Sequence, residues 1–158
     1  MYHGPLRGAV AKQYWIGDIL VGSHDEEVVE LCGWVHRTRG SNKIRFLVLR
    51  DSTGSLQCVI KKGAVDDGCF DALSGALIES SVRVTGKVIR TDREHGYELS
   101  VSTGNVVGAV NPDSPFPITE SAMAEADGGE TEFLLDNRHL YLRTSRMTKM
   151  LKIRSTVS

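Results

Sequence analysis

Alternation of apolar and polar residues is the clearest pattern in the first two thirds of the chain. It runs through five short stretches, at residues 28–36, 44–51, 55–62, 81–90 and 97–107. A period of two residues is typical of a strand that buries one face. The segments between the stretches are polar or contain glycine, as turns and loops require. The pattern therefore predicts five short strands.

The second and third strands should pair as an antiparallel hairpin, because Asp51–Gly54 between them has the residues of a tight turn. The apolar positions that would face the interior are Leu47, Leu49, Leu56, Cys58 and Ile60. Val59 is the exception to the alternation. Phe46 and Gln57 are then left together on the outer face. An isolated phenylalanine more often packs in a core, and that alternative stays open on pattern alone.

Two features modify the simple strand pattern. Gly33 inside the first strand indicates a bulge or a sharp bend, so parity does not decide which way Arg37 and Arg39 point. Between the third and fourth strands, residues 65–79 change to helical spacing. The apolar positions there are Phe70, Leu73 and Leu77, with Asp66 or Asp67 as the N-cap.

Three strands, a helix and two further strands predict an all-β fold with helical additions, namely a five-stranded Greek-key OB-fold barrel. In that fold, strands two and three bind oligonucleotides together with the loops that join strands one to two and four to five. Here those loops are Arg39–Lys43 and Thr91–Gly96, which places both beside Phe46 and Gln57. A barrel that binds a protein or a sugar is the alternative on pattern alone.

The composition divides the chain into four parts. These are an N-terminal extension (1–27), the barrel (28–108), an acidic linker rich in Pro and Ser (109–133) and a helical segment (134–158). We expect residues 1–13 to be loosely attached and Tyr14–Leu20 to pack against the barrel as a short turn or helix. The helical spacing stops in mid-pattern at Ser158, which suggests that another domain follows.

Charge is segregated along the chain, although the net charge is only −1. Residues 37–62 hold seven Lys or Arg and one acid, residues 113–136 hold seven acids and no base, and residues 138–154 hold six bases and no acid. A basic stretch around an outward Phe and Gln favours single-stranded nucleic acid as the ligand. It argues against a core position for Phe46 and against a protein or sugar ligand.

Other classes of function find little support in the sequence. The cysteines, Cys32, Cys58 and Cys69, have neither CxxC spacing nor a nearby His pair, so we do not expect a metal site. The chain has no Walker loop, no GxGxxG and no nucleophile–base set, so we predict no catalytic residue. There is no secretory signal and no apolar run of membrane-spanning length, and we expect a cytoplasmic location without membrane association.

Five segments together resemble the class II aminoacyl-tRNA synthetases of the aspartate/asparagine/lysine subgroup, and most closely the asparaginyl-tRNA synthetases. The segments are GWVHRTRG (33–40), RFLVLRDSTGSLQCVI (45–60), ESSVRVTGKV (79–88), GYELSV (96–101) and LLDNRHLYLR (134–143). The second and the last are the most specific, and the resemblance runs from about Glu30 to the end. Aspartyl-tRNA synthetases share part of the pattern and remain an alternative.

The resemblance implies a role for each residue of the predicted nucleic-acid face. Phe46 takes the place of the aromatic residue that stacks on the central uridine of the anticodon. Gln57 corresponds to the amide that hydrogen-bonds the same base. Arg39 corresponds to an arginine at the anticodon, and Arg37 to a contact with the RNA backbone. Glu98 corresponds to an acid that helps to read the first anticodon base.

The resemblance also implies what the parent enzyme would do. It would activate asparagine with ATP and Mg²⁺ and charge tRNA(Asn), using a catalytic domain after Ser158 through which the family's homodimers chiefly form. This chain would be the anticodon-binding domain, inactive by itself and without a cofactor. Residues 137–139 (Asn-Arg-His) would lie in the hinge, where packing is a simpler role than RNA contact. A non-catalytic OB-fold RNA-binding protein, with a gene ending near Ser158, is the remaining alternative.

Overall fold

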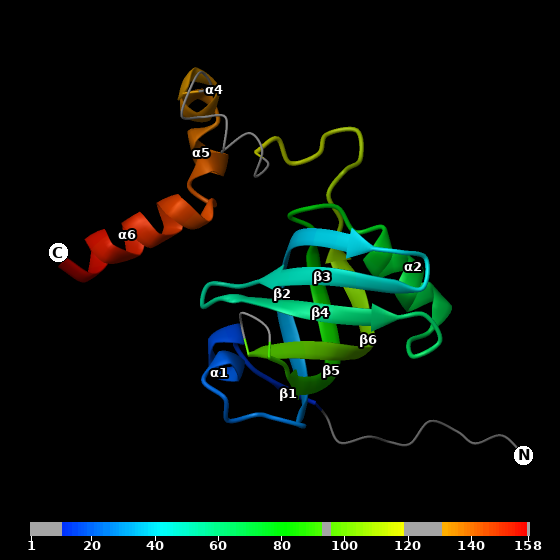
Figure 1. Ribbon diagram of the computed structural model, residues 1–158. Coiled ribbons are helices and arrows are strands. Elements are labelled where there is room, and N and C mark those ends of the chain that lie inside the picture. The colour runs from blue at the N-terminus through cyan, green and yellow to red at the C-terminus, as the bar shows by residue number, and fades with distance from the viewer. Residues whose placement is uncertain (1–10, 93–95, 119–130, 158) are drawn as a thin grey trace, which may run out of the picture. The chain divides into compact units, whose positions relative to one another are not determined.

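The computed structural model describes residues 11–92, 96–118 and 131–157. The chain forms two compact units, Met1–Pro115 and Phe116–Ser158. Among the described residues, the first unit contains a β-barrel with two helices, and the second contains three helices (Figure 1).

A closed barrel of five strands confirms the predicted OB-fold. The strands are β2 (Val28–Gly40), β3 (Ile44–Arg50), β4 (Ser55–Lys61), β5 (Ser81–Arg90) and β6 (Tyr97–Gly108). The sheet order is β1-β2-β3-β4-β6-β5, and an additional pairing of β2 with β5 closes the barrel. Neighbouring barrel strands are antiparallel except β4 and β6, which pair in parallel. The short β1 (Lys12–Gln13) runs parallel to β2.

The β3–β4 hairpin has the phase that the sequence predicts. Its five inward residues are at most 1% exposed: Leu47, Leu49, Leu56, Cys58 and Ile60. The Asp51 carboxylate closes the turn, since its Oδ1 accepts from the backbone N–H of Thr53 at 2.7 Å and of Gly54 at 2.9 Å. The hairpin is therefore fixed by local turn chemistry at one end and by the burial of one face along its length.

The bend in β2 lies elsewhere than predicted. The register between β2 and β3 shifts between Val35 and Arg37, so the extra residue is His36 and not Gly33. Gly33 instead permits a close approach of two backbones, because a Cβ there would lie 2.5 Å from the Arg50 carbonyl oxygen. The bulge inverts the alternation of β2 beyond His36.

The helix between β4 and β5 is shorter than predicted. Helix α2 (Asp67–Ser74) begins after Asp66, whose side chain accepts a hydrogen bond from the Cys69 N–H at 3.2 Å. Its buried residues are Cys69, Phe70 and Leu73. Leu77, predicted as the last member of the apolar stripe, lies beyond the helix and is 37% exposed. The helix ends at Ser74, with Gly75 as its C-cap, so the apolar spacing continues past the last helical turn.

Replacing Asp66 by alanine should lower the free energy of unfolding by about 1 kcal/mol, because the first turn of α2 loses its side-chain cap. Urea unfolding followed by tryptophan fluorescence would measure this, since Trp15 and Trp34 both belong to the first unit. Asp66→Asn is the matched control, because asparagine caps helices as well as aspartate does. Equal losses for both variants would contradict a capping role.

The N-terminal residues pack more closely than predicted. Helix α1 (Ile16–Leu20) lies against the barrel as expected, with Ile16 and Ile19 fully buried. The Ile16 N–H donates to the Asp51 carboxylate at 2.7 Å, which ties α1 to the hairpin turn. Lys12 and Gln13 were expected to be loose, but they pair with β2. Residues 1–10, the rest of that prediction, lie outside the described residues.

The second unit is helical, as its spacing predicts. It contains α4 (Thr131–Asp136), α5 (Arg138–Tyr141) and α6 (Ser145–Val157). Asn137 joins the first two, and its side-chain amide donates to the Phe133 carbonyl at 2.9 Å. This hydrogen bond links the Asn137 side chain to the backbone of α4, so Asn137 has a structural role within the second unit. Residues 119–130, which make up about half of the predicted linker, lie outside the described residues. None of the described helices is long and apolar enough to span a membrane.

Candidate nucleic-acid interface

Two rows of side chains cross the outer face of the barrel over β2, β3, β4 and β6. The first row is Arg39, Phe46, Val59 and Ser100. The second row is Arg37, Val48, Gln57 and Glu98. Residues paired directly across neighbouring strands point to the same side of a sheet. The register therefore places all five predicted site residues on one face, and Figure 1 shows β3 and β4 side by side in front with β6 next to β4.

The orientation of the two arginines follows from the bulge at His36. Without the extra residue, Arg37 and Arg39 would continue the inward positions of Val29, Leu31 and Val35. With it, Arg37 pairs with Val48 and Arg39 with Phe46, both on the outer face. Arg39 lies within β2 and not in the loop where it was expected.

A chain of hydrogen bonds connects three of the predicted residues. Nη2 of Arg39 donates to Oε1 of Gln57 at 3.1 Å, and Nε2 of Gln57 donates to Oε2 of Glu98 at 3.3 Å. A cation therefore holds the carbonyl end of the amide and an anion holds its amino end. This arrangement fixes the direction in which the Gln57 amide points.

Phe46 lies beside these hydrogen bonds and offers a flat aromatic surface. Its side chain is partly exposed, so it is not sealed in the core. The Arg39 guanidinium carbon lies 5.5 Å from the centre of the Phe46 ring, within the range of a cation–π contact. Arg39 thus contacts both the ring and the amide, and it couples the two groups that a base would meet.

The charge on this face comes from arginine and not from histidine. Burial, and next the positive charge of Arg50, lowers the pKa of His36. Arg50 itself donates to the Glu79 carboxylate at 2.6 Å. A lowered pKa favours the neutral imidazole at neutral pH, so His36 adds no positive charge there.

The described residues offer little for metal or nucleophilic chemistry. They contain no group of three or more His, Cys, Asp or Glu that could hold a metal ion. Burial raises the pKa of the Cys58 thiol to about 12, and burial also raises that of Cys69. Both are therefore thiols, not thiolates, at neutral pH. What this face can do is stack a flat ring, hydrogen-bond an edge and attract phosphate.

Sequence reasoning from the pattern alone missed Val59, Ser100 and the position of Glu98. Val59 departs from the alternation, and it is only 6% exposed although it lies on the outer face opposite Phe46. Glu98 lies next to Gln57 because β4 and β6 pair in parallel. No local sequence signal reports that pairing, so only the resemblance could place Glu98 in the site.

Comparison with known proteins agrees with this architecture. Residues 29–107 match the model of the family described as OB-fold nucleic acid binding domain. The asparagine–tRNA ligase of Thermoplasma acidophilum is 40% identical over 144 residues, which cover 90% of this chain and 31% of that protein. The asparagine–tRNA ligase of Koribacter versatilis is 38% identical over 138 residues, covering 87% of this chain and 30% of that protein.

A solved structure gives the same result. The crystal structure of asparaginyl-tRNA synthetase from Pyrococcus horikoshii complexed with asparaginyl-adenylate has a TM-score of 0.71 and 34% sequence identity. The match covers 84% of this chain and 29% of that one. The chain thus spans less than a third of each of these three relatives. Barrel, register and family match agree, and the chain belongs to the family of OB-fold nucleic acid binding domains.

Proposed function

We propose that this chain reads the anticodon of a tRNA, as the anticodon-binding part of an asparagine–tRNA ligase. The observation that carries the proposal is the contact of Arg39 with both the Phe46 ring and the Gln57 amide on one exposed face. The bases of an RNA loop expose a ring face and a Watson–Crick edge, and proteins read them with an aromatic side chain and a polar group together. This face supplies both groups and a positive charge beside them.

In this proposal Phe46 stacks on the central base of the anticodon and Gln57 reads its edge. A glutamine amide has two N–H donors and a carbonyl oxygen with two lone pairs. Glu98 takes one donor and Arg39 takes one lone pair, so one donor and one acceptor remain for a base. Uridine presents the complementary pair, because its N3–H is a donor and the carbonyl oxygens beside it are acceptors.

The fixed amide also explains how cytidine would be rejected. Where uridine has O4 and N3–H, cytidine has an amino group and an unprotonated N3, so its donor and acceptor are exchanged. A freely rotating amide could turn over to follow this exchange. Here Arg39 and Glu98 hold the amide from both ends, and stacking on Phe46 fixes the base. Selectivity for uridine therefore depends on the whole chain of hydrogen bonds and not on Gln57 alone.

The remaining site residues act on the RNA in less specific ways. Arg37 contacts the RNA backbone, and its charge adds a term that weakens as salt rises. Glu98 orients Gln57 and, as an acceptor beside it, helps to read the first anticodon base. The exposed side chain of Arg37 agrees with the first role, and the place of Glu98 at the start of β6, beside the loop between β5 and β6, agrees with the second.

The activity of the full-length protein belongs to the same proposal. It would use ATP and Mg²⁺ to activate asparagine, transfer it to tRNA(Asn), and act in the cytoplasm as a homodimer. The names of the relatives support the ligation of asparagine to tRNA, and the asparaginyl-adenylate held by the Pyrococcus horikoshii enzyme supports the activation of asparagine. Mg²⁺, the cytoplasm and the homodimer are proposed from the family resemblance alone. In this proposal that chemistry belongs to a part of the enzyme outside this chain, which spans less than a third of the three relatives named above.

Replacing Gln57 by alanine should relax selectivity at the middle base. The wild-type chain should prefer a stem-loop with a GUU anticodon to one with GCU, and the variant should lose about 1–3 kcal/mol of that discrimination, the usual value of a bidentate contact. Fluorescence anisotropy with labelled stem-loops measures both affinities. Gln13→Ala is the matched control, because Gln13 is exposed on β1 and outside both rows.

Two results would contradict the proposal. Unchanged selectivity in the Gln57 variant would remove its role as the reader of the middle base. A wild-type chain that binds GUU, GCU and GUC loops equally would instead behave as a general RNA-binding domain. A preference for GUC over GUU would assign the chain to an aspartate enzyme, because GUC reads the aspartate codons.

A further inference from the structure

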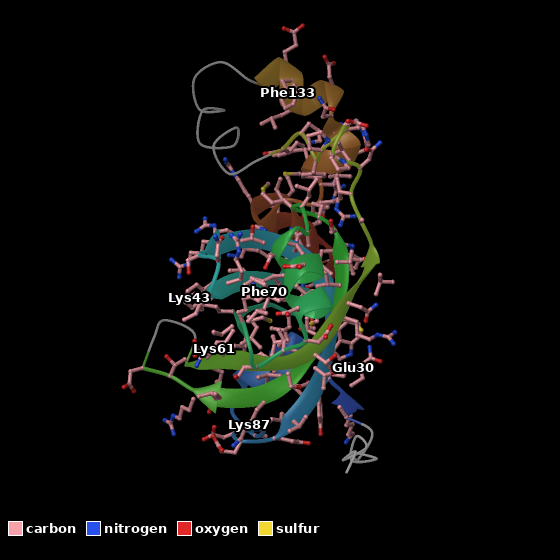
Figure 2. All side chains as sticks on the ribbon, turned by 90° about the vertical axis from the view of Figure 1, so that its right-hand side faces the viewer. Glu30, Lys43, Lys61, Phe70, Lys87 and Phe133 are labelled. Atoms are coloured by element: carbon pink, nitrogen blue, oxygen red, sulfur yellow. The ribbon has the colours of Figure 1, made fainter. Side chains whose placement is uncertain are left out.

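A second polar site lies at the end of the barrel that α2 covers. It is a pocket of about 360 Å³ between α2 and the start of β3. The side chains that matter for its chemistry are Asn42, Arg45, Lys62, Phe70, Asp71 and Ser74. Figure 2 shows Phe70 on α2, with Lys43 and Lys61 beside that helix. The volume is at the lower end of ordinary ligand pockets.

Arg45 is the unusual residue of β3. It precedes Leu47 and Leu49 on the inward-facing side of the strand, and it pairs with the buried Ile60. An arginine at such a position lies where the barrel core ends and the pocket begins. The Arg45 side chain thus extends from the inner side of β3 to the pocket. The next residue, Phe46, faces outward.

Two polar atoms in this pocket are buried without a hydrogen-bond partner among the described residues. They are Nε of Arg45 and Oγ of Ser74. Nearly all buried polar atoms in proteins have hydrogen-bond partners, so a buried donor without one is unfavourable. Both atoms can donate, and both belong to residues that line this pocket.

Lys62 contributes the second positive charge. Its ammonium lies 5.9 Å from the centre of the Phe70 ring, and its backbone N–H donates to the Lys43 carbonyl at 2.9 Å. These contacts hold Lys62 at the edge of the pocket. Asp71 is the only acid in the lining, so two cations against one carboxylate leave a net charge of +1.

We propose that this pocket binds a phosphate group of the same RNA strand whose bases lie on the outer face. The inference rests on the proposed function, since it takes that RNA as the ligand. Phosphate oxygens accept charge-assisted hydrogen bonds from the Arg45 guanidinium and the Lys62 ammonium, and the amide of Asn42 adds a further donor. Because Arg45 and Phe46 are adjacent, a strand stacked on Phe46 passes close to the pocket.

The pocket would position the RNA without reading its sequence, because every nucleotide carries the same phosphate. Its loss should therefore weaken all stem-loops alike. Arg45→Gln is expected to lower affinity for GUU and GCU stem-loops by the same factor, about three- to tenfold. It should also reduce the slope of log K against log salt by about 0.7, the value for one phosphate contact with a single strand.

Lys62→Gln provides a second variant that leaves the core untouched, because Lys62 is exposed. It should reduce affinity and salt slope in the same direction as Arg45→Gln. Arg83→Gln is the matched control, since Arg83 is exposed on β5 and pairs with Glu30 away from the pocket. Both its affinity and its salt slope should equal those of the wild-type chain.

Methylphosphonate substitution identifies the phosphate itself. In a series of stem-loops, each with one loop phosphate made uncharged, one position should weaken wild-type binding and have no further effect in Arg45→Gln. Additive losses at every position would overturn the proposal. So would shifts of the Ser74 and Gly75 amide NMR signals by inorganic phosphate without any such coupled position, a result that would instead indicate a site for free phosphate.

The two proposals fail in different ways. If the wild-type chain prefers GUU to GCU while the Arg45 and Lys62 variants keep wild-type affinity and salt slope, the phosphate pocket is wrong and anticodon reading stands. If the wild-type chain shows no base preference but the variants still lose affinity and salt slope, the phosphate pocket is supported for a different RNA ligand. Anticodon reading is then wrong.

Discussion

Replacing Phe46 by alanine is expected to weaken the binding of a GUU anticodon stem-loop by about 1–3 kcal/mol, or about 5- to 150-fold. Phe46 carries the only aromatic ring of the first row, and an aromatic ring is the side-chain surface on which bases commonly stack. Its removal also takes away the ring that the Arg39 guanidinium contacts at 5.5 Å. Arg39 then keeps its hydrogen bond to Gln57 but loses the cation–π contact that helps to orient its guanidinium. Fluorescence anisotropy at fixed salt measures the loss.

Two companion variants separate stacking from general damage. Phe46→Tyr keeps the ring and should retain most of the affinity, because stacking needs a π face and not a particular side chain. Phe133→Ala removes a phenyl group from α4 in the second unit and should leave the affinity unchanged. The slope of log K against log salt should be the same for Phe46→Ala as for the wild type, since no charge is removed. Wild-type affinity in a folded Phe46→Ala protein would show that the ring does not contact the RNA.

The sequence predicted the hairpin and its outer face because both depend on local signals. The alternation of β3 and β4 and the Asp51 turn decide together which residues face inward. A shift of one residue would move the whole apolar set to the solvent side, so the register is strongly specified. Phe46 and Gln57 follow from that register without any knowledge of the rest of the fold.

The rest of the site depends on contacts between distant parts of the chain. The bulge that turns Arg37 and Arg39 outward is at His36, and the nearby glycine that suggested a bulge serves a different purpose. The pairing of Glu98 with Gln57 joins residues 41 positions apart in the sequence. Local patterns carry no information on either feature, because both arise when the barrel closes.

The pocket under α2 was also beyond the reach of the sequence. Arg45 was counted among the basic residues near Phe46, yet its Nε is buried on the other side of the strand. The end of α2 at Ser74, earlier than predicted, brings the last turn of the helix to the pocket. Because side chains alternate along β3, this short strand contributes to both proposed binding sites. Phe46 lies on the outer face, and Arg45 lies at the end of the barrel that α2 covers.

Replacing Leu49 by alanine should lower the free energy of unfolding by about 2–5 kcal/mol, the usual cost of removing a large side chain from a packed core. Leu49 is fully buried and pairs with Val35 and Leu56 on the neighbouring strands. The missing side chain leaves a cavity that the barrel cannot easily close, because the strands around it are held by hydrogen bonds on both sides. Urea unfolding followed by tryptophan fluorescence reports this loss, since both tryptophans are in the first unit.

Leu49 also tests whether the inner and outer faces of β3 are separable. Under conditions where the Leu49→Ala chain is folded, its affinity for the GUU stem-loop should equal that of the wild type, because no residue of either row is changed. Val107→Ala, on a side chain that is 62% exposed on β6, should alter stability by less than about 0.5 kcal/mol. A stability loss as small as that of Val107→Ala would mean that Leu49 is not in a packed core. A large loss of affinity in the folded variant would mean that the outer face depends on the packing beneath it, so that stability and RNA binding could not be assigned to opposite sides of the strand.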